Sequence, residues 1–138
     1  MTILQPDLTA ADLMTIEPVV VALDAPIEQA EQLIRDHHVS GLPVVDGDGV
    51  LVGVISQTDF VHLDDPDVRG LIRHASSGIR VGEVMSRPAM TVLLTTRLVE
   101  AARLMTRERV HRVVVIDEKQ RPLGVLSAMD FVGLVAES

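Results

Sequence analysis

The sequence contains no cysteine, no tryptophan and no tyrosine, and only two of its 138 residues are phenylalanine. The absence of cysteine excludes disulfide bonds, thiolate metal ligands and thiol nucleophiles. Because 47% of the residues are nevertheless hydrophobic, a core must be built almost entirely from aliphatic side chains in close layers. Such a core favours a sandwich of strands and helices, in one compact domain or two very small ones.

Targeting segments are also missing from the sequence. The N-terminal stretch MTILQPDLTAADLM has no cationic region ahead of an apolar run, so no signal peptide is expected. No apolar stretch approaches the roughly 18 residues that cross a bilayer. We therefore expect a cytoplasmic protein that does not insert into membranes.

Basic residues are scarce in the first half of the chain. Residues 1–64 carry eleven acidic residues and one basic residue, Arg35, whereas residues 65–80 and residues 81–138 each carry one net positive charge. The net charge of −8 argues against a nucleic-acid partner, whose phosphates require a basic face. The asymmetry fits either an ordinary solvated surface or two halves that meet ligands of different charge.

The sequence repeats itself. Residues 53–60 read GVISQTDF, and residues 124–131 read GVLSAMDF. Residues 11–63 align with residues 82–134 without a gap, which identifies a tandem duplication. The identical pairs include Met14/Met85, Ala30/Ala101, Leu33/Leu104, Val44/Val115, Gly53/Gly124, Ser56/Ser127, Asp59/Asp130 and Phe60/Phe131.

Each copy predicts the same order of elements. Apolar runs of strand length alternate with an amphipathic helical pattern, and a glycine-containing turn joins the last two strands of the first copy. In the first copy we expect strands at 19–23, 42–45 and 50–55, a turn at 46–49, a helix that buries Ile27, Ala30, Leu33 and Ile34, and a last helix from Ser56. In the second copy, the first strand is expected at 90–94 and the last helix from Ser127. The order β-α-β-β-α, present twice, predicts an α+β fold with a sandwich arrangement.

The polar stretch between the copies is expected to be a linker. Residues 64–80 read DDPDVRGLIRHASSGIR and combine charge with proline, glycine and serine. We therefore expect a first repeat with its N-terminal segment at residues 1–68, and the end of the linker with the second repeat at residues 69–138.

The repeated motifs resemble those of the CBS domain, which is named after cystathionine β-synthase. The resemblance rests on the openings Met14-Thr15 and Met85-Ser86, the phrase VSGLPVVD at residues 39–46, and the closing pattern Gly-h-h-Ser-x-x-Asp in both copies. It covers about residues 10–136. Two CBS domains in tandem form a Bateman module, so the resemblance implies a standalone protein of two CBS repeats packed as a pseudo-two-fold pair.

The Ser-x-x-Asp pattern places a hydroxyl and a carboxylate at the start of each last helix. Such a start suits a phosphate, and the carboxylate of Asp59 or Asp130 could accept the hydroxyls of a ribose. The same pattern also matches a capping box, in which Ser56 or Ser127 caps the helix. The resemblance favours the ligand interpretation, because CBS pairs bind adenosine compounds through these two positions, and the two interpretations can hold together.

The resemblance also implies where the rest of a ligand would lie. In CBS pairs the adenine packs against the first strand and contacts backbone near a Gly-h-Pro segment. The matching positions are Val19, Val20, Gly41, Leu42 and Pro43 in the first copy, and Ala89, Met90, Thr91, Arg112, Val113 and Val114 in the second. The second copy lacks the Gly-Leu-Pro phrase. It carries His111-Arg112 instead, a pair that resembles phosphate-contacting residues of the γ subunits of AMP-activated protein kinase, with Arg109 nearby.

Positive charge is almost absent from the first copy, which offers only Arg35 and the pair His37-His38. We therefore predict that Ser127 and Asp130 belong to the better phosphate site. The site of Ser56 and Asp59 is expected to be empty or to take a less anionic adenosine compound. The histidine pair has no third ligand at a metal-like spacing, so no metal site is expected.

Together these patterns predict a non-catalytic regulatory sensor. It would bind AMP, ADP, ATP or S-adenosylmethionine between its two repeats, as in energy sensing, and regulate an unknown partner through its conformation or assembly. The resemblance implies a homodimer. The alternative is a ligand-free dimeric interaction or scaffold protein whose clefts are vestigial. No set of residues supplies a nucleophile with a base, so neither an enzyme nor a required cofactor is expected.

Overall fold

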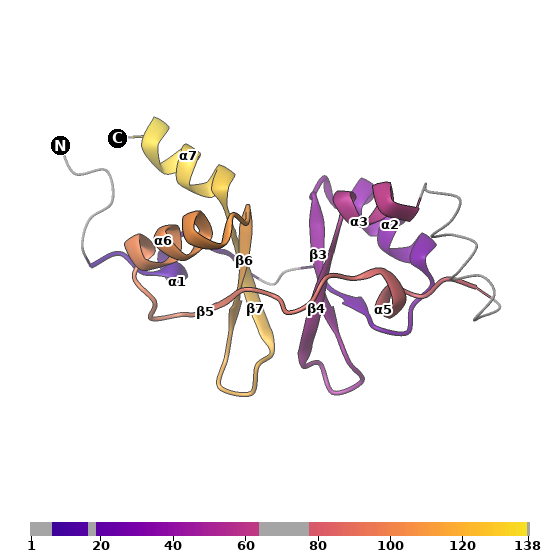
Figure 1. Cartoon of the computed structure of the whole chain (residues 1–138). Helices are drawn as coiled ribbons and strands as arrows, with labels where there is room; N and C mark the ends of the chain where they lie inside the picture. The colour runs from indigo at the N-terminus through magenta and orange to yellow at the C-terminus, as the bar shows by residue number, and fades with distance from the viewer. Residues whose placement is uncertain (1–6, 17–18, 64–77, 138) are drawn as a thin grey trace. The chain divides into compact units, whose positions relative to one another are not determined.

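The computed structural model describes residues 7–16, 19–63 and 78–137. The chain divides into two compact units (Figure 1). The unit Val19–Ala89 is called the first unit, and the unit formed by Met1–Pro18 with Met90–Ser138 is called the second unit. Each unit holds one sheet and one of the two copies of the repeated phrase.

The first unit contains a three-stranded sheet in the order β2-β3-β4. Strand β2 pairs parallel with β3, and β3 pairs antiparallel with β4. The elements are β2 (Val21–Ala22), α2 (Ile27–His37), β3 (Gly41–Val45), β4 (Leu51–Ser56), α3 (Gln57–Leu63) and α5 (Val81–Val84). The predicted order β-α-β-β-α is confirmed, although the first strand is shorter than the predicted 19–23.

The second unit contains a four-stranded sheet in the order β1-β7-β6-β5. Its elements are α1 (Ala10–Leu13), β1 (Thr15–Ile16), β5 (Thr91–Leu93), α6 (Leu98–Glu108), β6 (Arg112–Ile116), β7 (Pro122–Ser127) and α7 (Ala128–Ala136). The predicted order is again confirmed from β5 to α7. Helices α6 and α7 lie on the same side of their sheet (Figure 1). No helix in the described ranges has the length and apolar character that crossing a bilayer would require.

The segments that open the two sequence copies are exchanged between the units. Thr15 and Ile16, from the opening of the first copy, pair with Val125 and Gly124 of the second unit. Ser86, from the opening of the second copy, exchanges two backbone hydrogen bonds with Val54 of the first unit, at 2.8 and 3.1 Å. The compact units therefore do not follow the sequence copies at these openings. The expected boundary between residues 68 and 69, and residues 64–77 of the expected linker, lie outside the described residues.

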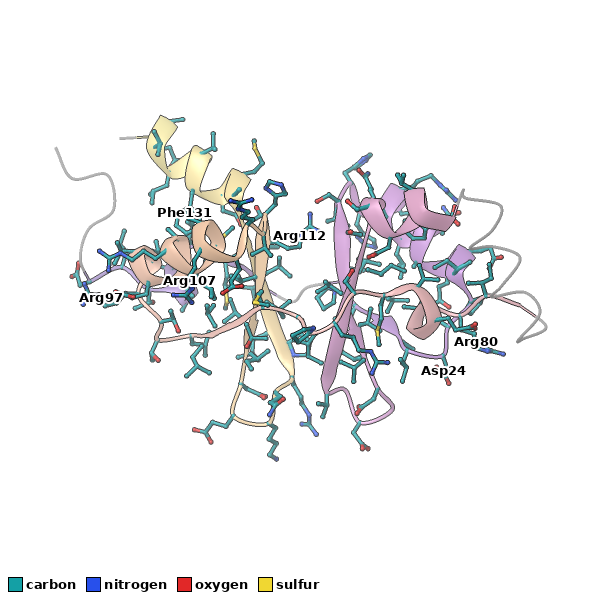
Figure 2. All side chains as sticks on the ribbon, viewed as in Figure 1. Asp24, Arg80, Arg97, Arg107, Arg112 and Phe131 are labelled. Atoms are coloured by element: carbon teal, nitrogen blue, oxygen red, sulfur yellow. The ribbon has the colours of Figure 1, made fainter. Side chains whose placement is uncertain are left out.

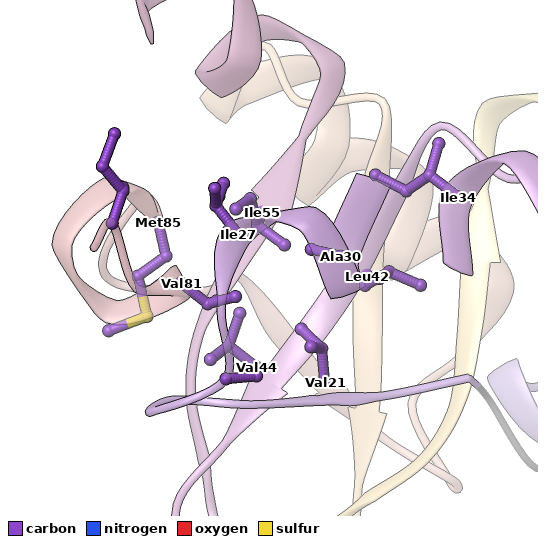
Figure 3. Packing of buried hydrophobic residues seen from close by; sticks show 11 residues of the cluster. Val21, Ile27, Ala30, Ile34, Leu42, Val44, Ile55, Val81 and Met85 are labelled. Carbon is purple, nitrogen blue, oxygen red and sulfur yellow. The ribbon is translucent and has the colours of Figure 1, made fainter. Parts of the chain in front are cut away.

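The core of each unit is aliphatic, as the composition predicted. Helix α2 buries Ile27, Ala30 and Ile34, while Leu33 packs at the margin of the same cluster. Figure 3 shows this core, which combines Val21, Ile27, Ala30, Ile34, Leu42, Val44, Ile55, Val81 and Met85. The matching core of the second unit consists of Ala10, Val92, Leu98, Ala101, Met105, Val113, Val115 and Leu126. These buried side chains hold the strand ends on which the candidate site residues lie.

Candidate functional site

The Ser-x-x-Asp pair of the second unit forms a reciprocal cap at the start of α7. The backbone N–H of Ser127 donates to Oδ2 of Asp130 at 2.7 Å, and the Ser127 hydroxyl donates to the same oxygen at 3.0 Å. The backbone N–H of Asp130 in turn donates to Oγ of Ser127 at 3.3 Å. The capping interpretation is therefore confirmed here. Both bonds from Ser127 reach Oδ2 of Asp130, and Oδ1 receives no hydrogen bond from the described residues.

In the equivalent pair of the first unit, both oxygens of the carboxylate have a donor. The backbone N–H of Ser56 donates to Oδ2 of Asp59 at 2.8 Å, and the Ser56 hydroxyl lies 3.4 Å from that oxygen. The hydroxyl of Ser86 donates to the second oxygen, Oδ1, at 2.8 Å. Asp59 is only 7% exposed, whereas Asp130 is half-buried. The two carboxylates thus differ in their solvent exposure and in the hydrogen-bond donors that they receive.

Strand pairing brings the predicted neighbours of each serine to its side. Gly41 at the start of β3 lies opposite Ser56 at the end of β4. Arg112 at the start of β6 lies opposite Ser127 at the end of β7. Arg112 therefore lies beside the start of helix α7 in the second unit.

The apolar candidates divide into buried and accessible residues. Leu42, Pro43 and Val113 are buried, so their side chains belong to the core and only their backbone is available to a ligand. Val19, Gly41, Met90 and Thr91 are partly exposed, and Val20 is exposed. In the second unit, the backbone N–H of Val114 donates to the carbonyl of Met90 at 2.9 Å, and Thr91 pairs with Val114. Each unit thus gathers its own set of candidates, and their role in binding stays a prediction.

The predicted basic cluster of the second unit is divided by the fold. Arg112 is partly buried, and the loss of solvent lowers the pKa of its guanidinium from the usual value; it remains a cation at neutral pH. His111 and Arg109 instead border a groove between α6 and α7. Figure 2 labels Arg112 on β6 and Phe131, which lines this groove from α7. Arg112 is therefore the basic residue that strand pairing joins to Ser127.

The groove between α6 and α7 is a feature that the sequence analysis missed. It has a volume of about 680 Å³ and is lined by Ala102, Met105, Thr106, Arg109, Val110, His111, Ala128, Phe131 and Val135. The matching surface of the first unit, about 560 Å³, is lined by Ile34, Arg35, His38, Val39, Ser40 and Gln57. The repeat alignment already contained a difference between the two surfaces. Arg35 and Gln57 of the first copy are replaced by the less polar Thr106 and Ala128 in the second.

Metal-ligand geometry does not occur in the described ranges. No group of three histidine, aspartate or glutamate side chains gathers there as metal ligands would. His37 ends helix α2, and His38 follows it in the left-handed conformation with a φ of 53°. The histidine pair therefore marks the end of a helix.

A family model of the CBS domain matches residues 10–65 and 81–137. Among curated proteins, the γ-3 subunit of 5'-AMP-activated protein kinase from Bos taurus is 36% identical over 117 residues, which are 80% of this chain and 22% of that protein. Inosine-5'-monophosphate dehydrogenase from Rhodopirellula baltica is 26% identical over 122 residues, 88% of this chain and 21% of that protein. The chain thus spans about a fifth of the length of these relatives.

Solved structures resemble the whole described fold. The crystal structure of CBSX2 in complex with AMP has a TM-score of 0.82 and 30% identity, and the match covers 94% of this chain and 97% of that chain. The CBS domain pair of protein MJ0100, in complex with 5'-methylthioadenosine and S-adenosyl-L-methionine, has a TM-score of 0.78 and 23% identity. That match covers 96% of this chain and 98% of the other, and shows a shared fold.

Proposed function

The chain belongs to the CBS domain family, and we propose that it is a non-catalytic regulatory module that binds an adenosine-containing ligand. The ligand class comprises AMP, ADP, ATP and S-adenosylmethionine. The observation that carries the proposal is the Asp130 carboxylate: Ser127 holds one of its oxygens, and the other has no hydrogen-bond donor among the described residues. A partly exposed carboxylate in this state can accept the hydroxyls of a ribose.

The surroundings of Asp130 suit the remaining parts of such a ligand. Helix α7 has nine residues, and its N-terminus carries partial positive charge that attracts a phosphate. Arg112, opposite Ser127 in the sheet, would add a guanidinium whose planar donors match phosphate oxygens. Met90 and Thr91, which precede and begin β5, would contact the adenine. The complex of the 30% identical CBSX2 with AMP supports the proposed ligand class.

Binding would regulate a partner protein through a population shift. A ligand that interacts better with one arrangement of the chain than with another moves the equilibrium toward the arrangement it prefers. Because adenosine nucleotides are made and consumed in the cytoplasm, a sensor of this kind would serve there. No residue of the proposed site needs to make or break a covalent bond, so the module would respond to its ligand without transforming it.

Calorimetric titration and thermal unfolding with AMP, ADP, ATP, S-adenosylmethionine and GTP would test the proposal. A ligand present at 100 times its Kd should stabilise the protein by about 2.7 kcal/mol. We expect stabilisation by at least one adenosine compound, little by GTP, and loss of binding in Asp130→Ala. Glu118→Ala, which removes a turn carboxylate from the same unit, is the matched control. If no adenosine compound binds the wild-type protein, the proposal is wrong.

The second candidate is a ligand-free dimeric interaction protein, and the surface of α7 favours it. Met129, Val132 and Val135 lie at a spacing of three residues and are 71%, 54% and 49% exposed. Helix α7 contains one charged residue, Asp130, and its Ala128, Phe131 and Leu134 pack partly buried against the core of the second unit. Exposed apolar residues along one helix favour a contact with another protein. We propose that this face joins two copies of the chain, in a homodimer that serves either function.

A further inference from the structure

The two Ser-x-x-Asp sites share one backbone arrangement. In the first unit, Ser86 exchanges backbone hydrogen bonds with Val54, and Gly53 faces the Ser86 carbonyl closely. In the second unit, Thr15 pairs with Val125, and Gly124 faces the Thr15 carbonyl in the same way. Ser86 and Thr15 are therefore equivalent positions on equivalent opening segments, and the difference between the sites lies in their side chains.

The side chains at this position differ in their contact with the carboxylate. The Ser86 hydroxyl donates to Oδ1 of Asp59 at 2.8 Å, so both Asp59 oxygens have a donor once the bonds from Ser56 are included. Thr15 is exposed and makes no side-chain hydrogen bond to Asp130 in the described part of the chain. A ribose hydroxyl would have to displace Ser86 at Asp59, whereas at Asp130 it would meet an oxygen that has no donor among the described residues.

Displacement at Asp59 brings no net gain in hydrogen bonding. The incoming hydroxyl would replace an existing hydrogen bond of the same kind, and it would have to reach a carboxylate that is 7% exposed. Charge acts in the same direction, because Gly41 stands in the first unit where Arg112 stands in the second. Both differences favour the second unit.

We propose that the Ser86 hydroxyl takes the place of a ligand hydroxyl at the Asp59 carboxylate. This hydrogen bond closes the first unit to adenosine ligands, so each chain binds one ligand, at Asp130. This inference rests on the proposed function and names the unit and the residue that set its stoichiometry. Ser86 would thereby set the number of ligands per chain, because its hydroxyl holds the second carboxylate oxygen of one of the two Ser-x-x-Asp sites.

Calorimetric titration with AMP tests the proposal through four single variants. The wild type is expected to bind one AMP per chain, and Asp59→Asn is expected to keep that stoichiometry with a Kd within about twofold. Asp130→Asn should weaken this binding at least about tenfold. Ser86→Ala should add a second, weaker binding event that disappears in Ser86→Ala/Asp59→Asn. Thr15→Ala, the matched control, should leave the titration unchanged.

The outcomes separate this inference from the proposed function. Two AMP molecules per wild-type chain, loss of binding in Asp59→Asn, or an unaltered titration of Ser86→Ala would each overturn the role of Ser86 while leaving the proposed function in place. If the wild type binds no adenosine compound, the proposed function fails. A double-mutant cycle of thermal unfolding between Ser86→Ala and Asp59→Asn then still tests the contact, since additive effects would contradict it.

Discussion

The α-carbon of Gly53 lies so close to the backbone of Ser86 that a Cβ at residue 53 would come within 2.7 Å of the Ser86 carbonyl oxygen. Gly124 stands in the same relation to the carbonyl oxygen of Thr15, also at 2.7 Å. In each unit a strand of the sheet thus requires glycine where the opening segment of the other sequence copy crosses it. The repeated glycine of the two closing phrases is explained by this close approach.

Replacing Gly53 by alanine should therefore destabilise the protein. The new methyl group would meet the Ser86 carbonyl and the Met85 side chain, and relief of such overpacking costs about 1–3 kcal/mol. Gly47→Ala is the matched control, because a Cβ there meets nothing within 4 Å. Urea unfolding of both variants measures the difference. Equal stabilities of the two variants would contradict the close approach.

The regular elements were predictable because their signals are local. Apolar residues at helical spacing identified α2 and α6, and the short turn at 46–49 identified the hairpin of the first unit. Gly49 there has a φ of 81°, and the equivalent Gln120 has a φ of 62°. Gln120 adopts the left-handed conformation without being glycine, which is why the turn of the second copy was signalled less clearly.

The exchange of the opening segments could not be read from the sequence. A repeat shows that two segments are homologous, but it does not say with which sheet a strand of two residues pairs. The contact between Ser86 and Asp59 spans 27 positions and depends on that exchange. The Ser-x-x-Asp pairs themselves were predictable, whereas the partner of the second Asp59 oxygen was not.

Asp117 should contribute to stability in a pH-dependent way. Its Oδ1 accepts the backbone N–H groups of Arg121 at 2.9 Å and Lys119 at 2.8 Å. The hydrogen bond from Arg121 is the largest cause that lowers the pKa of this carboxyl below its ordinary value. Since the folded pKa is depressed, the contribution is present above the unfolded pKa of about 3.9 and is lost as pH falls through the folded pKa.

We therefore expect Asp117→Asn to lower the free energy of unfolding at pH 6, and the difference from wild type to shrink below about pH 4. Denaturant unfolding at a series of pH values measures both. Glu118→Gln is the control, because Glu118 receives no hydrogen bond within the described ranges. A difference from wild type that stays constant down to pH 2 would show that the Asp117 carboxylate is not the stabilising species.

Arg112 should discriminate a nucleotide from its nucleoside. If its guanidinium binds the phosphate, Arg112→Ala should weaken AMP by on the order of 10- to 100-fold, the range expected for hydrogen bonds to a charged group. Adenosine, which lacks the phosphate, should lose little. Calorimetry with both ligands measures the ratio, and Arg121→Ala provides a control at the far end of the same hairpin. An equal loss for AMP and adenosine would assign Arg112 a structural role.

Charge on the apolar face of α7 should separate the proposed dimer. Val132→Glu would place a carboxylate among Met129, Val132 and Val135, and burying it without a partner is costly. We expect sedimentation equilibrium to show a dimer for the wild type at tens of micromolar and at least about tenfold weaker association for Val132→Glu.

The repeat supplies a matched control, Val61→Glu on α3, because Val61 holds the equivalent position and is 68% exposed. Gln57 and Thr58 stand at the start of α3 where Ala128 and Met129 stand in α7, so the surface of α3 is the more polar of the two. Dissociation by Val61→Glu but not by Val132→Glu would move the interface to the first unit, and a monomeric wild type would exclude the homodimer.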